Sequence, residues 1–210
     1  TLDHSMTQVP TRQNFTDAYA GEAPWDIGRP QASFLAIADQ VVTTAGVTVV
    51  GSGEIQAGQN VWQSLVGMQV GSIWGHGSYV APDWSADWLH REATALLDLW
   101  AQRDAGKAYA DLDAVQQAGL QARLQQTMRE NTYDSATGVI TVDEDRAQAI
   151  RQVNDHYMRL FGPDVELNTL RAQYAIQQNP IPDADQRQAM MAFFFWTSWA
   201  ATTNRPGETI

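Results

Sequence analysis

Tryptophan is the residue that most constrains how this sequence folds. The chain contains eight tryptophans among 210 residues. Each one is large and rigid and carries an N–H group that needs a partner when the ring is buried. Six lie in two clusters far apart in the sequence: Trp62, Trp74, Trp84, Trp88, Trp196 and Trp199. These clusters predict a single core in which aromatic side chains from distant segments pack together.

Charge and length set the class of protein. The chain carries 24 acidic and 13 basic side chains, giving a net charge of -11, and Lys107 is its one lysine. Such a surface repels the phosphates of nucleic acids and anionic lipid headgroups, which argues against a nucleic-acid partner. It suits the extracytoplasmic side of a bacterial membrane, where loops need not be positive. The length fits one domain with an appendage.

Cysteine is absent, which removes several kinds of chemistry. Without it the chain has no disulfide, no thiolate nucleophile and no Cys-x-x-Cys-His motif for covalent haem attachment. Its longest apolar run, residues 190–201, is too short to span a bilayer. Residues 1–10 lack the basic-then-apolar order of a signal peptide. We expect any export signal or membrane helix to lie outside this sequence.

Helical patterns dominate the second half of the chain. Apolar residues recur at helical spacing after residues 83, 113, 141–143 and 183, and aspartate is available as a cap at each start. Gly162 is the expected stop of the third helix. The first stripe consists of Trp84, Trp88, Leu89, Leu96, Leu97 and Trp100. The fourth helix is apolar nearly all round, which places it either at the centre of the core or against another greasy surface.

The remaining segments are shorter. Residues 41–50 are rich in Val and Thr around Gly46 and predict a β-hairpin or extended pair. Residues 131–138 read as a turn. We therefore predict a mainly α fold over residues 41–210, preceded by an N-terminal arm over residues 1–40.

Five motifs in order point to a known family. They are GQNVWQS at 58–64, GSIWGHGSYVAPDWSADWLHRE at 71–92, NTYD at 131–134, AFFFWTSWAA at 192–201 and NRPG at 204–207. Together they resemble the large extracytoplasmic segment of quinol-dependent nitric oxide reductases. The resemblance covers about residues 41–210.

That resemblance implies a cytochrome c-like helical domain that has lost its haem. The parent is a respiratory enzyme of denitrification that reduces two nitric oxide molecules to nitrous oxide, with electrons from a quinol. Its haem b groups and non-haem iron are held by membrane helices, so no catalytic, cofactor or metal ligand transfers to this chain. The implied partner is the membrane domain of the same polypeptide, on the periplasmic side of the inner membrane. Large rings are a reasonable filling for a vacated haem site.

The arm departs from this family. Residues 12–39 resemble the N-terminal lid of some class I S-adenosylmethionine-dependent methyltransferases, and residues 47–54 resemble their glycine-rich strand and loop. The alternation of strands and helices that such a fold requires is missing downstream. Two alternatives to the reductase domain therefore stay open: a small-molecule methyltransferase, and a free-standing helical domain that binds a partner.

Candidate core residues are Trp74, Trp84, Trp88, Trp196 and His76. His76 lies between two glycines, and we interpret it as a ring packed inward in a tight turn rather than as a haem or metal ligand.

Other polar residues favour ordinary roles. We expect His90 on a solvated helix face, in contact with Asp87 at i, i+3 spacing, and His156 as a satisfied surface histidine. Asp83 is interpreted as a helix cap. The nearby acidic residues Glu92 and Asp98 are not expected to form a carboxylate site.

Overall fold

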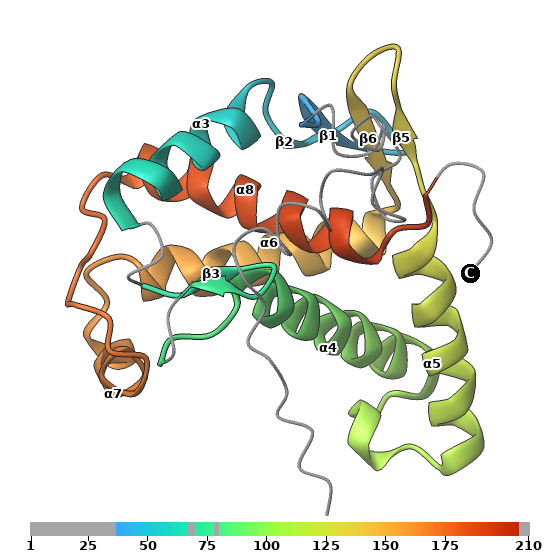
Figure 1. Ribbon diagram of the computed structural model, residues 1–210. Coiled ribbons are helices and arrows are strands. Elements are labelled where there is room, and N and C mark those ends of the chain that lie inside the picture. The colour runs from blue at the N-terminus through green and yellow to red at the C-terminus, as the bar shows by residue number, and fades with distance from the viewer. Residues whose placement is uncertain (1–36, 67–69, 78–79, 206–210) are drawn as a thin grey trace, which may run out of the picture. The chain divides into compact units, whose positions relative to one another are not determined.

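The computed structural model describes residues 37–66, 70–77 and 80–205 (Figure 1). These residues form a mainly helical fold, as predicted, with a small sheet beside the helices. The predicted arm falls outside the described residues up to position 36.

Four long helices each begin after an aspartate whose side chain accepts hydrogen bonds from N–H groups of the first turn, as the sequence predicts. They are α4 (Trp84–Ala105) after Asp83, α5 (Ala114–Arg129) after Asp113, α6 (Glu144–Leu160) after Asp143 and α8 (Ala184–Thr202) after Asp183. A Cβ at Gly162 would lie 2.6 Å from the carbonyl oxygen of Met158, so only glycine fits just beyond α6.

Shorter elements connect these helices. They are α3 (Glu54–Val61), a π-helical turn (Trp62–Val66), β3 (Ser72–Ile73), β4 (His76–Gly77), two 3-10 turns (Tyr109–Asp111 and Val165–Leu167) and α7 (Asn168–Gln173).

The predicted hairpin is formed by β1 (Gln40–Thr43) and β2 (Thr48–Val50), which pair antiparallel. Gly46 turns the chain with a φ of 80°, which glycine adopts without strain. Two further strands extend the sheet. β6 (Val139–Val142) runs parallel to β1, and β5 (Tyr133–Asp134) runs antiparallel to β6, giving the order β2-β1-β6-β5. The interpretation of residues 131–138 as a simple turn was therefore incomplete.

The turn after β2 does not have the topology of a methyltransferase. In that fold the glycine-rich turn joins two parallel strands through a crossover helix. Here β2 pairs antiparallel with β1, and the chain passes through α3 to β3, which belongs to a separate two-stranded sheet. The described part of the chain thus offers no parallel βαβ unit at residues 47–54.

Helix α8 is the centre of the core. Residues 189–199 are all buried, and α8 packs against α3, α4 and α6 (Figure 1). A Cβ at Gly58 of α3 would lie 1.9 Å from the carbonyl oxygen of Ala189, so glycine is needed for this close approach. Since the chain's own elements cover this stretch on all sides, the aromatic block is core and not a surface for a partner. None of the described helices is long and apolar enough to cross a membrane.

Three of the four tryptophans proposed for the core are buried, namely Trp84, Trp88 and Trp196. The prediction for Trp74 was wrong, because 40 % of this residue is exposed. Trp74 occupies the tight turn between β3 and β4 with a φ of 54°, and a turn at the surface leaves one face of its ring in solvent. Its Nε1 still donates to the carbonyl oxygen of Thr197 at 2.9 Å. The side chain of His76 lies outside the described part, so its role stays a prediction.

Candidate functional site

An aromatic cluster fills the space between α4, α6 and α8. Its centre is Trp84, which is fully buried and whose Nε1 donates to the carbonyl oxygen of Val70 at 2.9 Å. The ring of Trp84 lies 5.7 Å from Phe194 in a stacked pair, and 5.9, 5.2 and 6.0 Å from Tyr157, Phe161 and Tyr174 in edge-on pairs. A Cβ at Gly71 would lie 2.1 Å from Nε1 of Trp84. The indole is therefore enclosed on every side, with its polar atom satisfied.

A buried ion pair lies beside this cluster. Glu92 on α4 is fully buried and accepts from Nε of Arg146 on α6 at 2.7 Å. Its second carboxylate oxygen accepts from Nε1 of Trp88 at 3.0 Å. Arg146 also donates to the carbonyl oxygen of Thr127 at 3.3 Å, so the pair connects α4, α5 and α6. Sequence analysis placed Trp88 and Glu92 on one helix face, but the carboxylate's distant partner was not foreseen.

A second polar group joins α4 to α6 nearer the surface. One carboxylate oxygen of Asp87 accepts from the hydroxyl of Tyr157 at 2.5 Å and from Nε of Arg91 at 2.8 Å. Burial first, and then the negative charge of Asp87, raise the pKa of Tyr157 well above its ordinary value. Asp87 thus holds Tyr157 in its protonated form. The expected contact between Asp87 and His90 was wrong, because Arg91 and Tyr157 take up the carboxylate instead.

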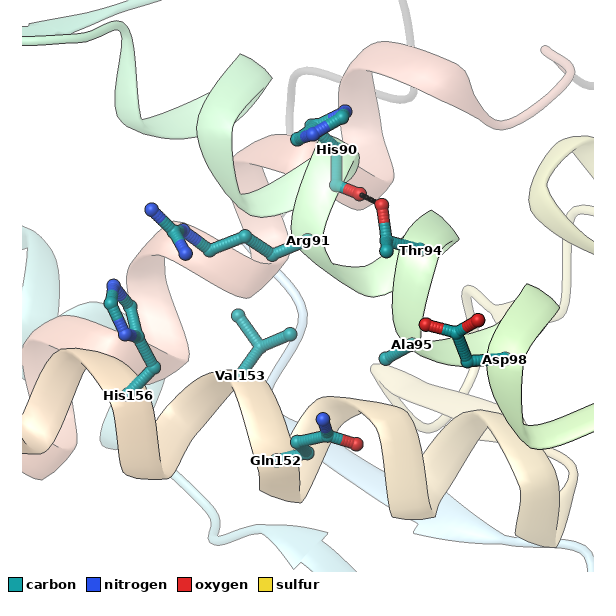
Figure 2. Close-up of a pocket in the computed structure, with 8 residues that line it drawn as sticks. All are labelled: His90, Arg91, Thr94, Ala95, Asp98, Gln152, Val153 and His156. Atoms are coloured by element: carbon teal, nitrogen blue, oxygen red, sulfur yellow. Dashed lines mark hydrogen bonds between the residues drawn. The ribbon is translucent and has the colours of Figure 1, made fainter. Parts of the chain in front are cut away.

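A groove of about 310 Å³ opens between α4 and α6 above these groups (Figure 2). Figure 2 shows His90, Arg91, Thr94 and Asp98 lining it from α4, and Gln152 and His156 from α6. The groove brings two histidines to one place, which their separation in the sequence did not indicate. The hydroxyl of Thr94 is turned back to the carbonyl oxygen of His90 at 2.9 Å.

His156 differs from the satisfied surface histidine that was expected. Its Nε2 is buried and has no hydrogen-bond partner among the described residues. Burial, followed by the positive charge of Arg91, lowers the pKa of His156 to about 4. The imidazole is therefore neutral near pH 7, and it is poorly matched to a proton-transfer role there.

The acidic residues of α4 do not form a shared site. Asp83 accepts from the Ser72 hydroxyl at 2.8 Å and the Gly75 N–H at 2.6 Å, so it fixes the β3–β4 turn as well as capping α4. Burial opposes ionisation of Asp83, but these bonds together lower its pKa. Asp98 accepts from the N–H of Tyr109 at 3.1 Å. Nowhere in the described residues do three or more His, Cys, Asp or Glu side chains form a group that could hold a metal ion.

A buried arginine that sequence analysis missed closes the end of α6. Arg171 is 2 % exposed, and its guanidinium donates to the carbonyl oxygens of Arg159, Leu160 and Gly162 at 2.6–2.7 Å. These carbonyls follow the last full turn of the helix and lack helical partners. Arg171 thus acts as a C-terminal cap supplied from α7, a role that its sequence neighbours do not indicate.

The geometry describes a scaffold. A filled aromatic core, two polar links between α4 and α6, and a groove without a poised acid or base leave little for chemistry. Comparison with known proteins agrees with this description in one respect: residues 38–210 match the family model of the cytochrome c-like domain of the nitric oxide reductase NorB. No curated protein matches the chain significantly. Because the matched region covers most of the sequence, the chain belongs to the family of NorB cytochrome c-like domains of nitric oxide reductases.

Proposed function

We propose that this chain is the extracytoplasmic, haem-free structural domain of a quinol-dependent nitric oxide reductase in the respiratory chain of denitrification. Catalysis belongs to the parent enzyme, whose membrane helices hold haem b and non-haem iron. The domain folds over that membrane part, its partner in the same polypeptide, and contributes no ligand to it. The net charge of -11 suits the periplasmic side of the inner membrane.

The observation that carries the proposal is the enclosure of Trp84. A cytochrome c-like domain that binds haem needs an open slot of several hundred cubic ångströms and, for covalent attachment, two cysteines. This sequence has no cysteine, and the rings of Tyr157, Phe161 and Phe194 surround Trp84. Haem does not fit among these residues without displacing them.

The proposal predicts that the purified chain does not bind haem. After incubation with one equivalent of haemin, the absorbance spectrum should equal the sum of the free components. A stoichiometric Soret band with histidine ligation that disappears in His76→Ala would overturn the proposal. Myoglobin stripped of its haem and treated identically serves as the positive control.

A further inference from the structure

A second hollow in this fold is separate from the groove of Figure 2. We name it the α5 groove: a cavity of about 600 Å³ between α4, α5 and the end of α8. Its apolar lining includes Leu89, Leu124, Met128 and Ala200, and its charged lining consists of Arg129 and Arg205.

The α5 groove exists because α5 is joined to the rest of the fold only along one edge. Helix α5 packs on α4 through a small cluster that is distinct from the main core: Leu96, Trp100, Met128 and Ala149. Its end is tied to the end of α8, where the N–H of Asn204 donates to the carbonyl oxygen of Arg129 at 2.8 Å. Between these attachments Leu89 and Leu124 stay only partly buried. The seam thus keeps apolar surface that the described part of the chain does not cover.

The charge of the α5 groove is opposite to that of the whole chain. Both charged residues that line it are arginines, whereas the chain as a whole carries -11. Arg129 is exposed, and no carboxylate pairs with it in the part of the chain that the structure describes. A second copy of the chain would bring a further -11 and be repelled. The surface that complements this groove is apolar with a carboxylate at its edge.

We propose that the α5 groove receives an extracytoplasmic segment of the parent enzyme's membrane domain, one that presents apolar side chains together with an Asp or Glu. The occupant rests on the proposed function, which places that domain in the same polypeptide. Apolar side chains of the segment fill the space over Leu124 and Met128, as in other complexes where an amphipathic segment lies in a groove. Its carboxylate pairs with Arg129 at the rim. The aromatic block of α8 is excluded from this contact because it is buried within the chain.

Site-specific photocrosslinking in the full-length reductase tests the docking. The photoreactive amino acid p-benzoyl-phenylalanine replaces Gln125, an exposed residue of α5 that lines the groove. The matched control is Gln126, its exposed neighbour, which does not line the groove. Irradiation is expected to join position 125 to an extracytoplasmic peptide of the membrane domain that contains an acidic residue. Position 126 should give no such product. A crosslink from position 125 to another copy, to lipid, or to nothing would overturn the proposal.

A charge reversal tests the role of Arg129. In the reductase with the photoreactive group at position 125, Arg129→Glu should lower the crosslink yield about tenfold, because two like charges then face each other. Lys107→Glu makes the same change in net charge at an exposed site outside the groove and should leave the yield unchanged. Equal loss in both variants would contradict a specific pairing.

Failure of this inference is distinguishable from failure of the proposed function. A haem b-containing enzyme that reduces nitric oxide but gives no crosslink from position 125 would refute the docking and leave the function standing. A full-length product without membrane helices or haem b would refute the function itself.

Discussion

Replacing Trp84 by alanine is expected to lower the free energy of unfolding by about 3–5 kcal/mol, the usual cost of removing a large buried ring. Trp84 is fully buried and contacts the rings of Tyr157, Phe161 and Phe194, which come from different segments, so no single segment can move to fill the space. Truncation also leaves the carbonyl oxygen of Val70 without its indole donor. Urea unfolding followed by circular dichroism at 222 nm measures the change without relying on tryptophan fluorescence.

Trp74→Ala is the matched control for this prediction. The residue is 40 % exposed, so its truncation should cost only about 1 kcal/mol, within the range of ordinary substitutions. Equal losses for the two variants would mean that the aromatic rings do not differ in how they support the fold. A loss below about 1 kcal/mol for Trp84→Ala would contradict the tightly packed core.

Removing Glu92 should be nearly as costly, for a different reason. Glu92→Ala leaves the guanidinium of Arg146, which is 4 % exposed, without its negative partner inside the protein. Breaking a buried ion pair in this way costs about 3–5 kcal/mol, because an uncompensated charge stays in a medium of low polarity. Trp88 loses the acceptor for its Nε1 as well. The same urea titration measures the effect.

The double variant Glu92→Leu/Arg146→Met separates two explanations of that cost. If the penalty comes from the stranded charge, replacing both partners by apolar side chains should restore stability to within about 2 kcal/mol of the original. If the double variant is less stable than Glu92→Ala, then the pair stabilises the fold through its own attraction and bonds. That result would contradict our account of the ion pair.

Local signals made the helices predictable. Asp83, Asp113 and Asp143 each accept hydrogen bonds from the turn that follows, and the apolar stripe of α4 faces the core as its spacing indicates. Such caps and periodicities depend on residues within one or two turns of each other. The hairpin at Gly46 was predictable for the same reason.

Long-range contacts escaped prediction because nothing near them in the sequence signals the partner. Strand β6 pairs with β1 about a hundred residues earlier, and Arg146 meets Glu92 at a separation of 54 residues. The exposure of Trp74 depends on a left-handed backbone that its residue type does not favour. His156 looked like a surface residue because its environment is created by α4.

The rate of nitric oxide consumption per haem b, measured in a full-length reductase carrying Trp84→Phe, tests the central claim most directly. The smaller ring weakens the packing of the domain while leaving any ligand of the membrane part untouched. We expect less assembled enzyme in the membrane but a rate per haem within about twofold of the unaltered reductase, since a structural defect changes the amount of enzyme and not its turnover. A normal amount of enzyme with a rate per haem lowered about tenfold or more would contradict the account, because the domain would then take part in the reaction itself.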